Sequence, residues 1–352
     1  MKSNKSCWSA AARALTFASV ILTSGLLHAQ PRTVRLPADS IDGLAAAIAS
    51  AGPGGTVILK SGLHTESGTV SVGFRVNIIG EPGAILETST SPDPDYPITI
   101  EAALHLKNAP HTKVEGIWFR PPASAVGSCA VVVEDSTHAE VLHNRVSDYQ
   151  FGVLVHHGDH AWISGNTIQV SDAWALDPGD PGFLIEADGI IVINGRYVRL
   201  RDNAISDGFQ GIWLCDEKGY CGENTLTDNY IGLILCRVAA ANFVISGADA
   251  VASQPGNAWL VHRNAAHDND WGIQVTDGTH HNVLLNNQAT GNRVYDCELT
   301  GDTWRWGFLV PGCFENHVVQ GGPTSLMVKD CGANNTLRGN VSLVDTNADP
   351  CY

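Results

Sequence analysis

Basic residues and methionine are the scarce residue types in this chain of 352 residues. It contains 21 Lys and Arg against 36 Asp and Glu, a formal net charge of −15, and only two Met. An acidic chain repels nucleic acid and anionic membranes, so neither is an expected partner. A copper-handling role would need soft ligands, and no Met-rich or Cys-x-x-Cys element supplies them.

Long apolar runs are missing outside the first 29 residues. In that segment Lys2, Lys5 and Arg13 accompany an apolar stretch at 14–27 and a cleavage site at 27–29, the pattern of an export signal. We therefore predict a signal peptide at 1–29, no membrane insertion, and a periplasmic or secreted protein. Its removal takes away three basic residues and leaves a net charge of −18. An anionic polysaccharide would then need a local basic patch or bridging cations.

A repeat organises the rest of the chain. Residues 203–236 contain the pattern Asn-x-apolar-x-Asp-x-x-x-Gly-apolar-x-apolar-Cys twice, starting at Asn203 and Asn224, and its Asn, Asp and Gly frame recurs from Asn144 and Asn264. A period of about 22 residues with short alternating strands predicts a solenoid. We expect the repeated Asn to form a ladder at one corner. Alternation points these apolar residues inward: Val153, Val155, Ile212, Leu214, Ile273 and Val275.

The domain reads as a single unit, residues 30–352, with a cap and three insertions. A helix is predicted at 40–51, with Ser40 as its N-cap and Gly52-Pro53 as its end. It would cover the first coil, whose open end exposes unpaired backbone. Insertions are predicted at 171–187, 237–256 and 295–304, and the first and third are expected to leave one corner and wall a groove.

The strands that follow the repeated Gly, such as Gly152-Val-Leu-Val, Gly189-Ile-Ile-Val and Gly211-Ile-Trp-Leu, give the chain a family resemblance. It resembles the right-handed parallel β-helix proteins of the pectin-lyase-like superfamily, in the short-repeat branch that includes NosD-type and carbohydrate-acting proteins. The resemblance covers roughly residues 40–345. It implies an all-β, right-handed, single-stranded parallel β-helix of about ten rungs with an N-terminal capping helix.

The resemblance implies no single activity, because this scaffold hosts lyases, hydrolases, epimerases and binding proteins. Signatures of its known enzymes are absent from the sequence: the Asp-Pro-His-Asp of mannuronan epimerases, the Trp-Ile-Asp-His of pectate lyases, and the Asn-Thr-Asp, Asp-Asp and Gly-His-Gly of polygalacturonases.

Candidate site residues lie on the outer face of the Gly strands, where side chains differ from coil to coil. Alternation clusters Glu134 with His156 and, further along, Asp216 with Arg237, a set that could perform acid–base work on a sugar. Four tryptophans on or beside this face are candidate sugar-binding residues: Trp213, Trp271, Trp306 and Trp174. A solvated face of mixed charge, with aromatics that pack loops, is the alternative interpretation.

The histidine-rich segment 156–160 looks like a metal cluster, but the repeat favours another interpretation. His111, His138 and His160 occupy one turn position in different coils, so a stacked turn ladder without metal is predicted. The repeated aspartates are likewise predicted to be turn residues: Asp148, Asp207, Asp228 and Asp268.

The eight cysteines that remain without Cys7 are an even number in an oxidising compartment, which predicts disulfides and no free thiols. Cys215 and Cys236 occupy matching positions on adjacent coils and are one candidate pair, and Cys221 is a competing partner for Cys215.

These features favour an exported enzyme that acts on a polysaccharide or oligosaccharide, a uronate-containing one, by lyase or epimerase chemistry rather than glycoside hydrolysis. Its base would be His or Arg, and Arg or Ca²⁺ would neutralise the sugar carboxylate. The alternative is a non-catalytic periplasmic protein, either carbohydrate-binding or a NosD-like scaffold or metal-handling β-helix.

Overall fold

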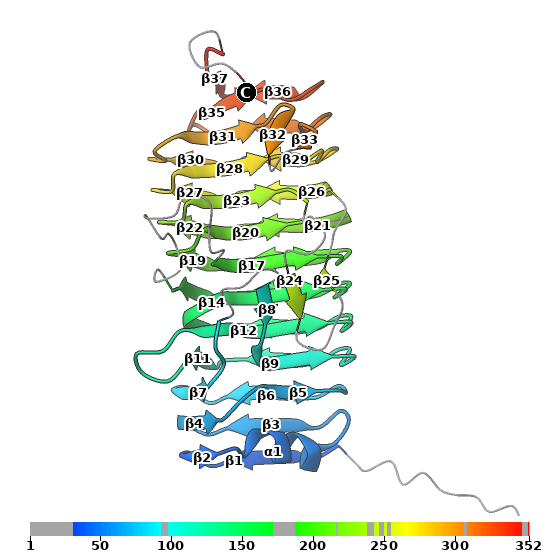
Figure 1. Ribbon diagram of the computed structural model, residues 1–352, viewed down its shortest axis with the longest axis vertical. Coiled ribbons are helices and arrows are strands. Elements are labelled where there is room, and N and C mark those ends of the chain that lie inside the picture. The colour runs from blue at the N-terminus through cyan, green and yellow to red at the C-terminus, as the bar shows by residue number, and fades with distance from the viewer. Residues whose placement is uncertain are drawn as a thin grey trace, which may run out of the picture.

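The computed structural model describes residues 31–92, 98–171, 187–215, 217–237, 243–245, 250–251, 255–305, 308–346 and 351. The chain folds as a right-handed parallel β-helix whose coils stack along the long axis from the N-terminus to the C-terminus (Figure 1). The predicted signal peptide at 1–29 lies outside the described residues. Within the described ranges, no helix is long and apolar enough to cross a membrane.

The first sheet takes one strand from each coil. Its 12 strands run parallel and follow chain order, one for each coil, where about ten coils were predicted. The strands are β1 (Thr33–Leu36), β3 (Thr56–Leu59), β6 (Asn77–Gly80), β10 (Lys113–Glu115), β13 (Glu140–Leu142), β15 (Trp162–Ser164), β18 (Val198–Arg201), β21 (Glu217–Gly222), β26 (Asn257–His262), β29 (Val283–Leu285), β34 (His317–Gln320) and β36 (Thr336–Gly339).

The second sheet has 20 strands arranged in two rows. We call the first the short row; it contains β2 (Ser40–Ile41), β4 (Gly62–Glu66), β7 (Ala84–Thr88), β11 (Trp118–Arg120), β16 (Thr167–Val170), β19 (Ala204–Ser206), β22 (Thr225–Thr227), β27 (Ala265–His267) and β30 (Gln288–Thr290). We call the second the long row; it contains β5 (Val70–Val72), β9 (Ala102–Lys107), β12 (Gly127–Glu134), β17 (Asp188–Ile193), β20 (Gln210–Leu214), β23 (Ile231–Leu235), β28 (Trp271–Val275), β31 (Tyr295–Leu299), β35 (Leu326–Asp330) and β37 (Val341–Leu343). Strand β14 (Arg145–His156) belongs to both rows.

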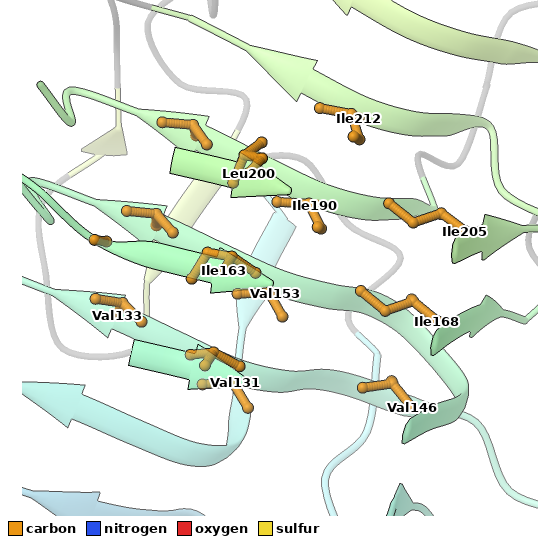
Figure 2. Close-up of a cluster of buried hydrophobic side chains, with 14 of the residues drawn as sticks. Val131, Val133, Val146, Val153, Ile163, Ile168, Ile190, Leu200, Ile205 and Ile212 are labelled. Atoms are coloured by element: carbon orange, nitrogen blue, oxygen red, sulfur yellow. The ribbon is translucent and has the colours of Figure 1, made fainter. Parts of the chain in front are cut away.

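The core lies inside the coils, and the predicted alternation is confirmed. All six residues predicted to point inward are buried at 1% exposure or less. Val153, Ile190 and Ile212 are direct partners on successive coils of the long row, and Figure 2 shows their side chains in one column. The repeated Gly is explained by the close approach of the next coil, because a Cβ on Gly211 would lie 2.5 Å from the carbonyl oxygen of Gly232.

The corner asparagines form the predicted ladder. Each Nδ2 donates to the Oδ1 of the next amide at 2.9–3.2 Å, in the order Asn144, Asn166, Asn203, Asn224, Asn264 and Asn287. The sequence interpretation missed two further ladders: Asn229, Asn269 and Asn292, and Asn282, Asn316 and Asn335. These amides satisfy buried polar groups at the corners, which would otherwise destabilise the fold.

The N-terminal cap is shorter than predicted. Helix α1 spans Leu44–Ala51 with Gly43 as its N-cap, whereas Ser40 lies in strand β2, so the predicted start was wrong. The helix needs no local cap because the carboxylate of Glu66, one coil further on, accepts the Leu44 backbone N–H at 2.8 Å. The helix ends at Gly52 as predicted, and its buried face covers the first coil: Leu44, Ala47, Ile48 and Ala51.

The first two predicted insertions are described only in part. Residues 172–186 of the first lie outside the described residues. In the second, β24 (Phe243–Ile245) and β25 (Ala250–Val251) form a three-stranded sheet with β8 (Ile98–Ile100), a segment distant in sequence.

The third insertion was placed wrongly. Tyr295 and Cys297 of β31 pair in register with Trp271 and Ile273 of β28, so 295–299 is a regular coil strand. The departure from the repeat is instead the antiparallel hairpin of β32 (Thr303–Arg305) and β33 (Phe308–Val310). The sequence pattern skipped this coil because Asp296 stands where the repeat has Gly. The hairpin leaves after the long row, whereas the first insertion leaves after the short row, so the two do not share a corner.

The cysteines do not follow the expectation of no free thiols. Cys331 and Cys351 form a disulfide, and six others are unbridged: Cys129, Cys215, Cys221, Cys236, Cys297 and Cys313. Cys215 and Cys236 lie on adjacent coils as predicted but are not bonded. Burial raises the pKa of the Cys236 thiol well above its usual range, and the neighbouring Cys215 adds to this. The Cys236 Sγ instead accepts a hydrogen bond from Trp213 Nε1.

Candidate active site

The outer face of the long row, where the sequence places the candidate site, is apolar in the middle coils. Its outward column consists of Val132, Leu154, Ile191, Trp213 and Ile234, none more than 5% exposed. Together with Ile100 of β8 they belong to a second hydrophobic cluster outside the coil. Strand β8 therefore packs against this face (Figure 1), and the trough expected to be open here is filled.

A polar cluster lies on the same outer face where the strands β9, β12 and β14 end. Lys107, Glu134 and His156 are direct partners on three successive coils, so the predicted proximity of Glu134 and His156 is observed. The Glu134 carboxylate lies 3.2 Å from Lys107 Nζ and 2.7 Å from His105 Nε2. The two histidines and Glu134 are buried, whereas the Lys107 side chain is 39% exposed. The Glu134 carboxylate is thus buried, and the partly exposed Lys107 side chain is the member of the cluster that reaches solvent.

Both buried imidazoles have depressed pKa values. Burial lowers the pKa of His105 and outweighs the opposing effect of Glu134. Neutral His105 then donates its Nε2–H to the carboxylate, which can only accept. Burial, helped by the neighbouring His157, lowers the pKa of His156 to about 4. His156 is therefore a neutral imidazole at neutral pH, with one ring nitrogen protonated and the other an acceptor.

His156 also carries an unsatisfied ring nitrogen. Its Nε2 lies 3.5 Å from Asn194 Nδ2, and its ring stacks on His157 with centroids 4.0 Å apart. Its Nδ1 is buried and has no hydrogen-bond partner in the part of the chain that the structure describes. A buried nitrogen without a partner is unfavourable by about 1–3 kcal/mol, so its presence calls for a reason.

The other predicted site residues lie apart from this cluster or outside the described chain. Asp216, Trp174 and Trp306 belong to the residues whose positions are not described. Arg237 is exposed and follows β23. Since β23 is three coils beyond β14, Arg237 lies about 14 Å along the axis from His156.

The two described tryptophans of the predicted binding set are enclosed to different degrees. Trp213 is 4% exposed, and its Nε1 donates to Cys236 Sγ, so its ring has no open face for a sugar. Trp271 is partly buried and meets Tyr230 edge to face, with centroids 4.8 Å apart. Of these two rings, only Trp271 retains an exposed surface.

Sequence reasoning missed His105 and undervalued Lys107. Lys107 shares the outward position of Glu134 and His156, and His105 precedes it by two residues on the same face. A signal for both was present, because His105 and Lys107 are the polar residues of the otherwise apolar strand Ala102–Lys107.

The second histidine cluster is a turn ladder, as predicted. His111, His138 and His160 stack with centroids 4.7 and 4.8 Å apart, and Tyr197 continues the stack at 5.0 Å. All four have positive φ, as do the repeated turn aspartates: Asp148, Asp207, Asp228 and Asp268. No group of three or more His, Cys, Asp or Glu residues suited to a metal ion occurs among the described residues.

Comparison with known proteins identifies the architecture. Residues 103–289 match the family described as a right handed beta helix region. No curated protein sequence matches the chain.

Among solved structures, the tailspike protein of Escherichia coli bacteriophage HK620, seen in complex with a pentasaccharide, is similar with a TM-score of 0.54 and 14% identity. The alignment covers 86% of this chain and 56% of the tailspike, so the chain spans just over half of that protein. The A-module of a mannuronan C-5 epimerase from Azotobacter vinelandii has a TM-score of 0.45, 14% identity and coverages of 86% and 92%. A periplasmic alginate epimerase has a TM-score of 0.46, 11% identity and coverages of 82% and 77%. At these identities the likeness concerns the fold alone.

Proposed function

The chain belongs to the family with a right handed beta helix region, and from that premise we propose that it is an exported enzyme acting on a uronate-containing polysaccharide. The observation that carries the proposal is the buried Glu134 carboxylate, which is bound to His105 and Lys107 beside a neutral His156 with an unsatisfied nitrogen. Clusters with strongly perturbed pKa values and unsatisfied groups occur preferentially at functional sites.

The proposed chemistry begins with removal of the C5 proton of a uronate. His156 accepts this proton at Nε2, whose contact with the Asn194 amide is long at 3.5 Å, and the Lys107 ammonium stabilises the negative charge that develops on the sugar carboxylate. In a lyase the electron pair forms a C4–C5 double bond as the C4–O bond breaks, and the leaving oxygen takes a proton from water. In an epimerase water donates a proton to C5 from the opposite face, His156 releases its proton to solvent, and no bond to the next sugar breaks.

Each neighbour of His156 has a defined task in this scheme. Glu134 holds Lys107 and His105 in place. An anionic sugar beside His156 raises the pKa of the imidazole, which makes it a stronger base than in the free protein. Arg237, about 14 Å further along, would contact a different sugar of a long chain rather than the reacting one. Trp271 is a second candidate contact, and Ca²⁺ stays a prediction as an alternative partner for the sugar carboxylate.

The test screens the protein without residues 1–29 against polysaccharides that contain mannuronate, guluronate, galacturonate or glucuronate. Absorbance of unsaturated uronates reports a lyase, proton NMR of the products reports an epimerase, and new reducing ends without unsaturation report a hydrolase. On the substrate found, Lys107→Met, Glu134→Gln and His156→Ala should each lower turnover by about 100-fold or more. Lys113→Met is the control, because Lys113 pairs with Glu115 on the surface of the first sheet.

Folded variants of Glu134 and His156 that keep full turnover would end the assignment of these residues. Loss of turnover in a metal chelator, restored by Ca²⁺, would assign carboxylate neutralisation to the cation rather than to Lys107.

A non-catalytic carbohydrate-binding or scaffolding β-helix is the second candidate function. The observation in its favour is the covered outer face, where five stacked apolar side chains are each no more than 5% exposed and so offer no contact surface to a polymer along the middle coils. Absence of turnover on every polysaccharide of the panel, with retained binding to one of them, would favour this alternative.

A further inference from the structure

We propose that the outer face of the first sheet binds an acidic oligosaccharide on a strip formed by Trp162, Arg199 and Tyr220. The three residues are direct register partners on three successive strands, β15, β18 and β21. This sheet is separate from the long row that carries Glu134 and His156. The proposed strip is therefore a second site, on a different sheet from the cluster proposed to carry the chemistry.

Exposed apolar side chains gather on this part of the sheet. Trp162 is 42% exposed, and Leu260, the next register partner after Tyr220, is 36% exposed. Tyr197, in the turn immediately before β18, is 49% exposed. Most other large apolar residues of the described chain are buried inside the coils, so these side chains form a local surface feature. An aromatic ring held on a rigid sheet can stack on the apolar face of a sugar at little cost in ordering.

The Tyr220 ring packs against the sheet because Gly222 has no side chain. A Cβ on Gly222, two residues further along the same strand, would collide with the end of the Tyr220 ring. The ring therefore lies over Gly222 and is supported by the backbone of β21 on one side. The ring is half-buried and meets the His262 ring edge to face, with centroids 6.4 Å apart, so part of it remains open to a stacking ligand.

The charge at the centre of the strip indicates the kind of ligand. Arg199 is exposed and makes no ion pair with any described residue, although the neighbouring Arg201 is bound by Glu223 at 2.6 Å and by Asp202 at 3.2 Å. Although the protein has a net charge of −15, the Arg199 guanidinium, with an aromatic residue on the strand to either side, attracts anions locally. A guanidinium matches a carboxylate in geometry and can bind it with two hydrogen bonds. A carboxylate-bearing sugar chain supplies both this group and apolar ring faces.

The spacing of the strip fits a short chain that runs along the helix axis. Trp162 and Tyr220 are two coils apart, about 10 Å, with Arg199 midway between them. A ligand of at least three sugars can stack on both rings and place the carboxylate of its middle sugar at Arg199. Such a site would hold a polymer on one face of the β-helix without cutting it.

The experiment measures binding by calorimetry in the Glu134→Gln variant, so that turnover of the probe does not interfere. The probes are oligouronates of six sugars prepared from alginate and from polygalacturonate, with cellohexaose as the neutral comparison. At least one oligouronate should bind, and its affinity should fall as salt rises. Arg199→Ala and Trp162→Ala should each weaken binding by about 10-fold or more, because each removes a main contact.

Arg338→Ala is the matched control, since Arg338 is an exposed arginine of the same sheet, five strands beyond β18. It should leave the affinity within about 2-fold. Equal binding of cellohexaose, or unchanged affinity in a folded Trp162→Ala, Arg199→Ala double variant, would overturn the proposal. A dimer in solution that Trp162→Ala dissociates would overturn it too, because the strip would then be an interface between copies of the chain.

Discussion

Replacement of Asn203 by Ala should destabilise the β-helix more than any exposed asparagine does. The Asn203 side chain makes four buried hydrogen bonds: its Nδ2 donates to Ile163 O at 3.0 Å and to Asn224 Oδ1 at 2.9 Å, and its Oδ1 accepts from Asn166 N at 3.1 Å and Asn166 Nδ2 at 2.9 Å. Alanine removes all four and does not fill the space with a polar group.

The expected loss of unfolding free energy depends on which hydrogen bonds the partners of Asn203 retain. Asn166 Nδ2 still donates to Val141 O, and Asn224 Oδ1 still accepts from the backbone N–H of residue 203. The Asn166 backbone N–H loses the acceptor that the ladder supplies, which costs about 1–3 kcal/mol for a buried donor. With about 0.5–1.5 kcal/mol for each of the other three bonds, the free energy of unfolding should fall by about 2.5–7.5 kcal/mol.

Urea unfolding followed by circular dichroism and by tryptophan fluorescence measures the loss. Because coils of a solenoid contact mainly their neighbours, agreement of the two signals checks that unfolding is cooperative. Asn340→Ala is the control, since that exposed side chain bonds only to carbonyl oxygens of a C-terminal turn, and it should cost less than about 1 kcal/mol. Equal stabilities of the Asn203→Ala and Asn340→Ala variants would refute the account of the ladder.

Three further predictions concern other parts of the chain. Gly211→Val should abolish soluble folded protein, because a Cβ there would lie 2.5 Å from Gly232 O, whereas Gly68→Ala, with open space around it, should express normally. The pKa of His156 is lowered to about 4, so the unfolded state binds more protons between pH 4 and 6.5; stability should therefore fall as pH drops through this window, by about 2–3 kcal/mol, and His156→Gln should remove that part of the pH dependence in urea titrations. His160→Asn should leave the metal content of the purified protein unchanged by elemental analysis, and stoichiometric copper or zinc lost in the variant would contradict the turn ladder.

The fold was predictable because the residues that determine it recur in successive coils. Asn203 and Gly211 recur with the same spacing in successive coils, and each copy needs only its neighbour to explain it. The Asn satisfies the backbone of the previous coil, and the Gly leaves room for the carbonyl of the next. The turn histidines were identified by the same logic. Where one residue departs from the repeat, as Asp296 does at a Gly position, a regular coil strand was wrongly predicted to be an insertion.

The candidate site depended on contacts that do not repeat. The outward position of Trp213 was readable from alternation, but its burial comes from packing outside the coil, where Ile100 belongs to the same cluster from a strand distant in sequence. Alternation likewise placed Glu134 beside His156, yet the bond from His105 and the depressed pKa of His156 follow from burial. Sequence by itself determined which side chains face outward, because that depends on strand period. Only the tertiary structure decided which of them meet water, because that depends on what packs over them.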